Sequence, residues 1–380
     1  MEGSLHVDAV WDGASVSSVS VRSFRMLQAG RLAIGQTPQQ AAGLLPMLFG
    51  ICKRAQGVAA SMATEAAAGI DAPEAVQTAR RLQVQGETML EHLWRILHDW
   101  MILAKLPSGM QAIARMRALL DEALSSANDA CHGFEAGRLH CLLSEFLHRE
   151  VFGCEPLHWL ELDTRHALQD WCESVDAPAA KILNALAACG RFGSSSIALM
   201  PEPDATWLRE ASQAISLDAD FAQQPHFRGS ALETGALARQ QHSPLLSSLM
   251  REEGNTVFVR AAARLTELAN LASGGEYAAW AGALQLGRNE GISWVQCARG
   301  LLMHRVVTDG ARVLDYRIVA PTEWNFHADG ALVQGLRGMT AADGESVRNM
   351  AEWLVQSLDP CVACRVTVRD ARTISEAQEA

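Results

Sequence analysis

The chain has 380 residues, of which 49% are hydrophobic and 20% are charged, which excludes a disordered or low-complexity protein and indicates a globular fold with a large core. No apolar segment approaches the roughly 20 residues that a membrane-spanning helix needs, and the N-terminus has neither the basic start nor the apolar stretch of a secretory signal, so we expect a cytoplasmic protein without membrane contacts. The net charge is −11 and Lys and Arg form no dense cluster, so nucleic acid is not expected as a partner.

The first predicted element is a β-hairpin within residues 1–35. Apolar residues alternate with polar ones on both sides of Asp12-Gly13, a dipeptide that favours the positive φ angles of a tight turn. Residues 36–290 are predicted to be mainly helical. Thr37-Pro38 offers an N-cap followed by proline at the first helical position. Farther along, apolar residues recur at steps of three and four.

A second hairpin is predicted within residues 291–330, where the apolar period changes to two around Asp309-Gly310. Residues 331–380 are predicted to hold a last helix, which Thr340 and Asp343 open and Pro360 ends. The chain is thus expected to form a single domain of the α+β class, mainly α: a helical bundle with β-hairpins near both ends of the chain.

The chain has nine cysteines, an odd number, and their positions are scattered along the sequence. This does not suggest a disulfide framework, so we expect reduced thiols. Cys361 and Cys364 form a C-x-x-C pair on a turn after the last helix, a spacing that lets both sulfurs face one metal ion or form a redox disulfide. A thioredoxin-type pair would precede a helix. A four-cysteine zinc site would need a second such pair, but Phe49 stands three residues before Cys52.

The segment from Asp359 to Cys364 resembles the D-P-C-x-x-C-x-x-H signature at the C-terminus of nickel–iron hydrogenase large subunits. Five other segments are similar to this family's R-I-E-G-H, L-F-R-G, R-x-C-G-x-C-x-x-x-H, A-P-R-G-x-x-x-H and V-P-T-T-W-N motifs in the same order: residues 2–3, 24–25, 49–56, 298–304 and 320–325. The chain is identified as a member of this family, and a fold like that of the large subunit is expected.

In the catalytic family four cysteines hold nickel and iron, and the second cysteine of each pair bridges the two metals. By position, the resemblance makes Cys52 and Cys364 the bridging ligands and Cys361 a nickel-only ligand. Phe49 occupies the fourth position and offers no lone pair to a metal, so no nickel site with four thiolates is expected.

The positions on the iron side of the family's site are retained. Arg299, Pro321 and Thr322 match the residues that surround the cyanide ligands of iron, where a guanidinium and a hydroxyl can donate hydrogen bonds. In contrast, Gln28 and Thr367 replace the carboxylate and the terminal histidine that help to bind magnesium in the family, and they make a poor site for a hard cation.

This combination resembles the shortened, non-catalytic HupK/HoxV type of hydrogenase expression/formation protein. The resemblance implies a maturation scaffold rather than an enzyme, which binds Fe(CN)2CO transiently, without nickel, and passes it to the catalytic large subunit. The implied partners are the iron-carrying maturation chaperone, its iron–sulfur assembly partner and the hydrogenase large-subunit precursor.

Other interpretations remain open. The three thiols could be remnants that only pack in the core, as in a structural or redox subunit related to hydrogenase large subunits, whereas a catalytic large subunit is disfavoured by Phe49 and Thr367. Several further residues have both a functional and a structural interpretation. Glu2 is either a proton-relay carboxylate or part of a fraying terminus, and Arg299 either orients a ligand or forms a buried ion pair. His304 is either a site residue or a core imidazole, and Cys297 is either an extra thiol or a packing residue. Cys131-His132 and His140-Cys141 could be metal ligands, but their spacing is more in keeping with structural residues.

Overall fold

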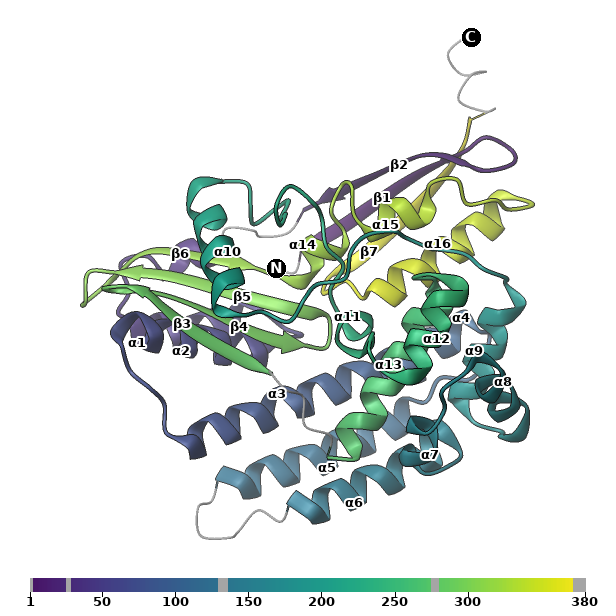
Figure 1. Ribbon diagram of the computed structural model, residues 1–380, viewed down its shortest axis with the longest axis horizontal. Helices are drawn as coiled ribbons and strands as arrows, with labels where there is room; N and C mark the ends of the chain where they lie inside the picture. Colours follow the sequence, from purple (N-terminus) through teal and green to yellow (C-terminus); the bar gives the residue numbers. More distant parts are fainter. Residues whose placement is uncertain (1–2, 25–28, 129–135, 275–279, 372–380) are drawn as a thin grey trace.

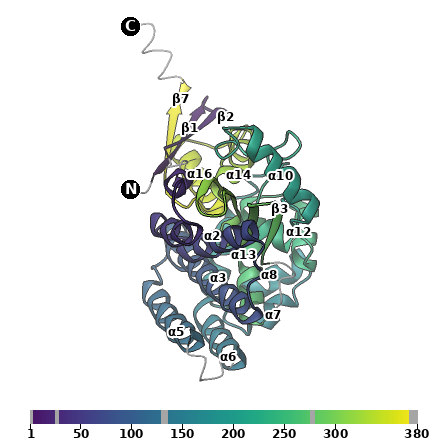
Figure 2. The ribbon, with the colours of Figure 1, turned by 90° about the vertical axis from the view of Figure 1, so that its left-hand side faces the viewer.

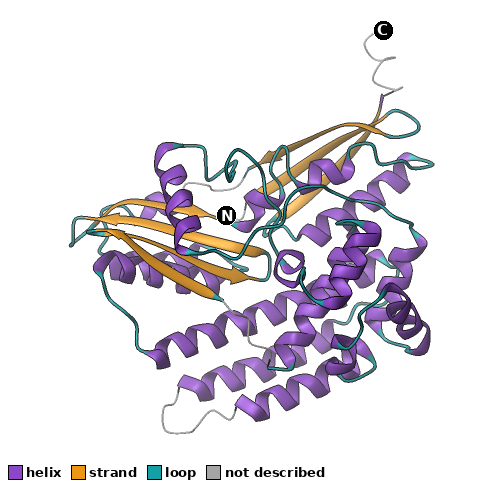
Figure 3. Ribbon diagram, viewed as in Figure 1, coloured by secondary structure: helices purple, strands orange, loops and turns teal. Residues whose placement is uncertain are grey.

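The computed structural model describes residues 3–24, 29–128, 136–274 and 280–371. Helices make up most of the chain, and most of them lie below the two β-sheets in the view of Figures 1 and 3, whereas the helix at Ala205–Leu217 (α10) lies above the sheet on the left. The fold is therefore of the α+β class and mainly α, as the sequence predicts. Within the described ranges, no helix combines the length and the apolar composition that crossing a membrane requires.

In the helical part, most segments share one large core, and the others pack in two smaller clusters with strands of the second sheet. Its α-helices are α1 (Pro38–Leu44), α2 (Lys53–Ala68), α3 (Glu74–Trp94), α4 (Met101–Leu103), α5 (Met110–Asn128), α6 (Ala136–Leu147), α7 (Pro156–Leu160), α8 (Arg165–Ser174), α9 (Pro178–Ala188), α10 (Ala205–Leu217), α11 (Ala236–Gln240), α12 (Pro244–Glu253), α13 (Val257–Ala272), α14 (Pro321–Asn325), α15 (Ala331–Leu336) and α16 (Gly344–Leu358). The short 3-10 helices η1 (Ala29–Ala33) and η2 (Leu45–Leu48) and the π-helical stretches η3 (Arg95–Trp100) and η4 (His148–Phe152) complete it.

Helix α13 runs through the middle of the core. It begins after Thr256, whose side chain accepts the backbone N–H of Val259, and every one of its residues except Asn270 is buried. A helix buried on all sides needs neighbours on all sides, and α13 contacts α3, α6, α7, α9, α11, α12 and α16. It therefore carries its few charged residues into the interior.

The first sheet joins segments from both ends of the chain. Strands β1 (Ser4–Trp11) and β2 (Val16–Ser23) form the predicted hairpin, and β7 (Ala363–Asp370) pairs with β1 in parallel, with Leu5 opposite Cys364. Figures 1 and 2 show the purple and yellow strands side by side. The prediction that both cysteines of the C-x-x-C pair lie on a turn is wrong for Cys364, the second residue of β7.

The second sheet is an antiparallel meander of β3 (Ala281–Gly287), β4 (Glu290–Cys297), β5 (Gly300–Thr308) and β6 (Val313–Val319). Helix α2 packs directly on it. A Cβ atom at Gly291 would come within 2.4 Å of the carbonyl oxygen of Ala63, so only glycine permits this approach. The contact fixes α2, which Cys52 precedes, against the sheet that carries His304.

Three sequence-based boundaries are wrong. Strand β3 lies inside the stretch predicted to be helical, residues 36–290, and the hairpin predicted for residues 291–330 covers only three strands of a four-stranded sheet. The β3 sequence, AGALQLG, contains no β-branched or aromatic residue that would indicate a strand. Helix α16 begins after Asp343, which accepts the backbone N–H of Ser346, and not at Thr340.

Candidate metal-binding site

Cys52 lies at the N-terminus of α2. It is the N-cap residue, but its side chain makes no capping hydrogen bond. The carboxylate of Glu87 on α3 takes that role and accepts the backbone N–H groups of Arg54 at 2.8 Å and Ala55 at 3.0 Å. Because unpaired N–H groups at a helix terminus are costly when buried, Glu87 ties α3 to the segment that carries the thiol.

Cys361 is held by Thr322 on α14. Helix α16 ends before Asp359, which has a φ of 56°, and Pro360 prevents the helix from continuing. The hydroxyl of Thr322 donates to Sγ of Cys361 at 3.2 Å and accepts the backbone N–H of Cys361 at 3.3 Å. Thr322 is buried, as is Pro321 at the first position of α14. The structure thus brings two of the predicted site residues, Thr322 and Cys361, into direct contact.

The thiols of Cys52 and Cys361 lie near each other, from segments 309 residues apart in the sequence. Burial, and then the neighbouring Cys361, raise the pKa of Cys52 well above its usual range, whereas Arg299 opposes this shift. Burial raises the pKa of Cys364 to about 12. All three cysteine residues are partly exposed and free of disulfides. Because their pKa values are raised, the thiols of Cys52 and Cys364 hold their protons near neutral pH, and a metal bound there would have to displace them.

In the described part of the chain, no group of three or more His, Cys, Asp or Glu side chains is arranged to hold a metal ion. The structure therefore brings Cys52 and Cys361 together but does not place Cys364 with them in a three-thiol cage. Phe49, at the position of the family's fourth thiol, is partly buried at the end of η2. A metal bound between these thiols needs further ligands of its own.

Arg299 supplies a buried positive charge beside the thiols, in the turn between β4 and β5. Its guanidinium donates to Glu91 at 2.7 Å, and its Nε lies 3.5 Å from Oδ1 of Asp359. Burial alone would lower the pKa of Arg299, but Asp359, Glu91 and the two nearby thiols raise it well above its usual range. The interpretation of Arg299 as a member of a buried ion pair is confirmed. Its role toward cyanide stays a prediction.

Asp359 gathers two more guanidinium groups. Arg95 donates to one carboxylate oxygen at 2.5 Å and Arg264 of α13 to the other at 2.7 Å. Burial would raise the pKa of Asp359, but the three arginines hold it well below its usual range. Asp359, which precedes Pro360 and Cys361, is therefore a buried anion that ion pairs connect to η3 and α13.

This network continues away from the thiols through His92. Arg264 donates to Nδ1 of His92 at 3.2 Å, so the ring proton resides on Nε2 and is donated to Glu267 at 2.7 Å. Burial lowers the pKa of His92 to about 4, which keeps the ring neutral. Glu267 also pairs with Arg239 of α11. A continuous series of buried hydrogen bonds thus connects the cysteine segment with α3, α11 and α13.

Other predicted site residues have structural roles or lie elsewhere. His304 is a buried imidazole with hydrogen bonds from both ring nitrogens, and the thiol of Cys297 is buried and donates to the carbonyl oxygen of Gly300 at 3.2 Å. Thr367 pairs with Asp8 in the first sheet. Four candidates lie outside the described residues: Glu2, Gln28, Cys131 and His132.

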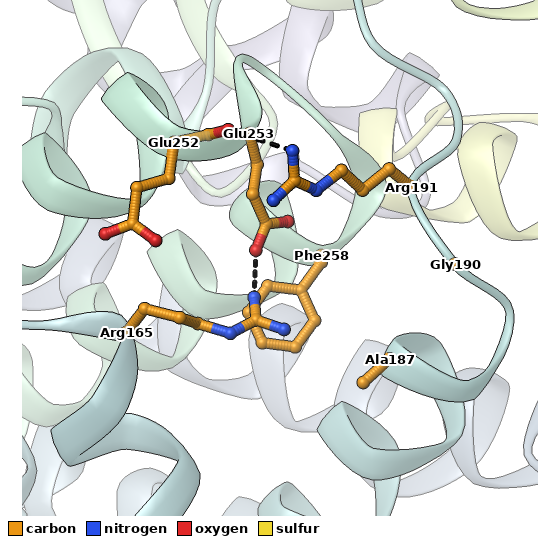
Figure 4. Close-up of a pocket in the computed structure, with 7 residues that line it drawn as sticks. All are labelled: Arg165, Ala187, Gly190, Arg191, Glu252, Glu253 and Phe258. Carbon is orange, nitrogen blue, oxygen red and sulfur yellow. Dashed lines mark hydrogen bonds and ion pairs between the residues drawn. The ribbon is translucent and has the colours of Figure 1, made fainter.

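A pocket at the junction of α8, α9, α12 and α13 is separate from this site (Figure 4). Arg165 pairs there with Glu253 and stacks on the ring of Phe258, 4.2 Å from its centroid, while Arg191 donates to the carbonyl oxygen of Glu252 at 3.2 Å. The charged groups are used in contacts within the pocket, and none of the candidate cysteines lines it.

Glu87, Gln56, Arg95 and Arg264 were not predicted as site residues from the sequence. A signal was present for Gln56, which follows Cys52 by four residues and so shares its face of α2. Arg264 lies inside an apolar helical stripe, and a charged residue at such a position indicates buried pairing. Its partners could not be read from the sequence, because they belong to distant elements.

Comparison with solved structures defines the fold family. The chain is similar to the Ni-Fe-Se hydrogenase of D. vulgaris Hildenborough, with a TM-score of 0.57 and 15% identity over 92% of this chain and 94% of that chain. It is also similar to an NAD+-reducing [NiFe]-hydrogenase, with a TM-score of 0.55 and 16% identity over 91% of this chain and 92% of that chain. At such identities the likeness shows the fold alone, which is that of the nickel–iron hydrogenase large subunit.

The sequence relatives are more specific. The family model for nickel-dependent hydrogenase matches residues 255–367. Hydrogenase expression/formation protein HoxV of Cupriavidus necator is 33% identical over 88% of each chain, and HupK of Azotobacter vinelandii is 32% identical over 97% of this chain and 99% of its own. The chain belongs to this HoxV/HupK family of hydrogenase expression/formation proteins.

Proposed function

We propose that this chain is a scaffold for hydrogenase maturation that receives iron carrying two cyanides and one carbon monoxide and passes it to the catalytic large subunit. The iron unit is cargo and not a resident cofactor. A maturation role agrees with the names of the relatives, which are hydrogenase expression/formation proteins. The identity of the cargo comes from the resemblance to nickel–iron hydrogenase large subunits, and the chemistry of the site supports it.

The observation that carries the proposal is a buried guanidinium beside two free thiols. Iron with strong-field ligands prefers soft thiolates, which Cys52 and Cys361 can provide. Its cyanide nitrogens are anionic acceptors, which suit the fixed donors of Arg299 and the hydroxyl of Thr322. Because such iron brings three ligands of its own, two protein thiolates are a reasonable receiving pair.

The same residues favour transfer over catalysis, and we propose that the chain is not an enzyme. Phe49 removes the fourth thiolate that a nickel site of this family would need, so nickel is not part of the cargo. Scaffolding also requires donors and acceptors of the iron unit. We propose the iron-carrying maturation chaperone with its iron–sulfur partner as donor and the hydrogenase large-subunit precursor as acceptor.

Infrared spectroscopy of protein isolated without oxygen from hydrogenase-producing cells tests the cargo. We expect cyanide and carbon monoxide stretching bands in the wild type and their loss in Cys52→Ala and Cys361→Ala, with unchanged circular dichroism. The influence of Cys361 on the pKa of Cys52 favours Cys361 as its partner, whereas the resemblance favours Cys364, so Cys364→Ala separates the two assignments.

Cys172→Ala is the matched control, because Cys172 is a buried cysteine on α8 that contributes to the core. Its bands should equal those of the wild type. The site assignment is wrong if the Cys52, Cys361 and Cys364 variants all keep full bands. Affinity isolation from the same cells tests the partners, and recovery of neither the chaperone nor the large-subunit precursor contradicts that part of the proposal.

A further inference from the structure

A chain of three buried side chains ends on the sulfur of Cys52. Gln56 of α2 donates from Nε2 to Sγ of Cys52 at 3.8 Å, and its Oε1 lies 2.9 Å from Nε2 of His304 on β5. Nδ1 of His304 lies 2.8 Å from the hydroxyl of Tyr316 on β6. All three side chains are at most 2% exposed. None of them has a role in the function proposed above.

The direction of these hydrogen bonds follows from the protonation states. Burial lowers the pKa of His304 to about 3, so its ring is neutral, with one nitrogen as donor and the other as acceptor. Burial raises the pKa of Tyr316 well above its usual range, so the hydroxyl keeps its proton. These protonation states leave two possible directions for the hydrogen bonds that link Tyr316, His304 and Gln56.

Tyr316 decides this direction. Among the described residues its hydroxyl has no other hydrogen-bond partner, so it either donates to Nδ1 of His304 or leaves a buried O–H unpaired, which is energetically costly. With Nδ1 as acceptor, the ring proton is on Nε2 and is donated to Oε1 of Gln56. The amide group of Gln56 then presents its N–H to Cys52. In the reverse direction, the hydroxyl proton of Tyr316 would have no acceptor, and the amide oxygen of Gln56 would face the sulfur of Cys52.

We propose that Tyr316, His304 and Gln56 form a directional relay that holds an N–H donor on the sulfur of Cys52, which makes Gln56 a positioning residue for the cargo iron. The last step rests on the proposed function; the direction of the relay does not. When a metal displaces the thiol proton, the sulfur becomes anionic and accepts this hydrogen bond more strongly. The bond withdraws electron density from the sulfur and weakens its donation to iron, which suits a ligand that later releases its cargo.

The direction of the relay is tested on the full chain without iron, by NMR of protein with ¹⁵N-labelled histidine. We expect His304 to be the neutral Nε2–H tautomer throughout pH 6–8, with its signal assigned by its loss in His304→Gln. Tyr316→Phe should give a mixture of tautomers, because the terminal donor is gone. An Nδ1–H tautomer or a protonated ring at His304 in the wild type overturns the relay, even if Tyr316→Phe does not fold.

The effect on iron is tested by infrared spectroscopy of the loaded protein. Gln56→Met keeps the length of the side chain but removes the donor, so the carbon monoxide band should shift to lower wavenumber. Thr266→Val is the matched control, because it removes a buried hydroxyl on α13 that accepts from Trp159, and its band should not move. An unshifted band in Gln56→Met, or the same shift in both variants, overturns the positioning role.

The two measurements separate the inference from the proposed function. If the wild type carries no cyanide or carbon monoxide bands, the cargo proposal fails, and NMR still decides whether the relay has the stated direction. If the bands are present but insensitive to Gln56→Met, the cargo proposal stands and the positioning role of Gln56 fails.

Discussion

Asp359 balances three buried guanidinium groups with a single carboxylate, at the point where the chain leaves α16 for Cys361. Arg95 also pairs with Asp99 and Arg299 with Glu91, but a neutral residue of the same shape at position 359 leaves buried Arg264 without a carboxylate partner among the described residues. We expect Asp359→Asn to lower the free energy of unfolding by about 3–5 kcal/mol, the usual cost of breaking a buried ion pair from one side. Urea denaturation at pH 7 measures this change.

Asp8→Asn is the comparison for that experiment, because Asp8 pairs with Arg22, whose side chain is 59% exposed. An exposed pair contributes about 0–1 kcal/mol. Equal losses of stability in the two variants would show that the burial of the Asp359 network adds nothing.

At the scale of single residues, the sequence predicted the site where a motif is local and failed where partners come from other elements. Cys361 and Thr322 were found because each belongs to a short segment similar to a family motif. The helices that bring Arg95 and Arg264 to Asp359 could be predicted from their apolar period, but their mutual orientation could not. A helical period defines which face is buried and leaves open what that face meets.

Between α2 and α3, Glu87 acts as a capping group whose own burial is costly. Burial, which outweighs the hydrogen bonds from Arg54 and Ala55, raises its pKa to about 7, against 4.5 for an ordinary glutamate. Between these pH values the folded chain holds more protons than the unfolded chain, so this contribution to stability falls as pH rises. Relative to wild type, Glu87→Gln should therefore gain stability from pH 5 to pH 8.

Urea denaturation at several pH values measures this trend. Glu155→Gln is the control, because hydrogen bonds from His148 and Ser144 lower the pKa of Glu155 and move its titration below the tested range. A stability difference between wild type and Glu87→Gln that does not change with pH would mean that Glu87 is ionised throughout.

Strand β7 makes the last part of the described chain a component of the first sheet. Thr367 pairs with Asp8, and the three residues after it continue the pairing as far as Trp11. In the catalytic family that the sequence resembles, the extension beyond the corresponding position is removed after nickel insertion. Here such a cut would divide a strand, so we expect the protein in its native host to keep residues 368–380.

Intact mass spectrometry of protein from the native host measures this directly. A chain that ends at Thr367 would contradict the expectation. A recombinant chain shortened after Thr367 serves as comparison, and it should unfold at lower urea concentration because it loses the pairing of Val368, Arg369 and Asp370 with β1.

The elements differ in how clearly the sequence indicated them. The alternation in β1 and β2 was clear because one face of the hairpin packs on the core. Strand β7 was missed although Val366 and Val368 alternate with polar residues. Its partner is β1, and a parallel pairing between the two ends of a chain leaves no turn residue as a signal. The sequence of β3 contains no β-branched or aromatic residue, so it gave little indication of a strand.

For the whole molecule, the large-subunit fold does not by itself confer hydrogenase activity. We expect no hydrogen–deuterium exchange above a metal-free control when the purified protein is supplied with nickel, because Phe49 provides no ligand at the fourth position. Gas-phase mass spectrometry of the isotopic products measures the exchange, with a catalytic large subunit treated in the same way as positive control. Reproducible exchange that requires Cys361 would contradict the non-catalytic role.

The parallel pairing of β1 with β7 also determines when the protein can begin to work. More than 350 residues separate these strands, and closing so long a loop is slow and entropically costly. At a synthesis rate of about 5–20 residues per second, β1 waits for its partner for roughly 20–70 s. During that time the edge of β1 that later pairs with β7 has no partner strand. Once residue 52 is synthesised, the nascent chain has Cys52 but not Cys361, so both thiols of the candidate site are present only after synthesis has passed residue 361.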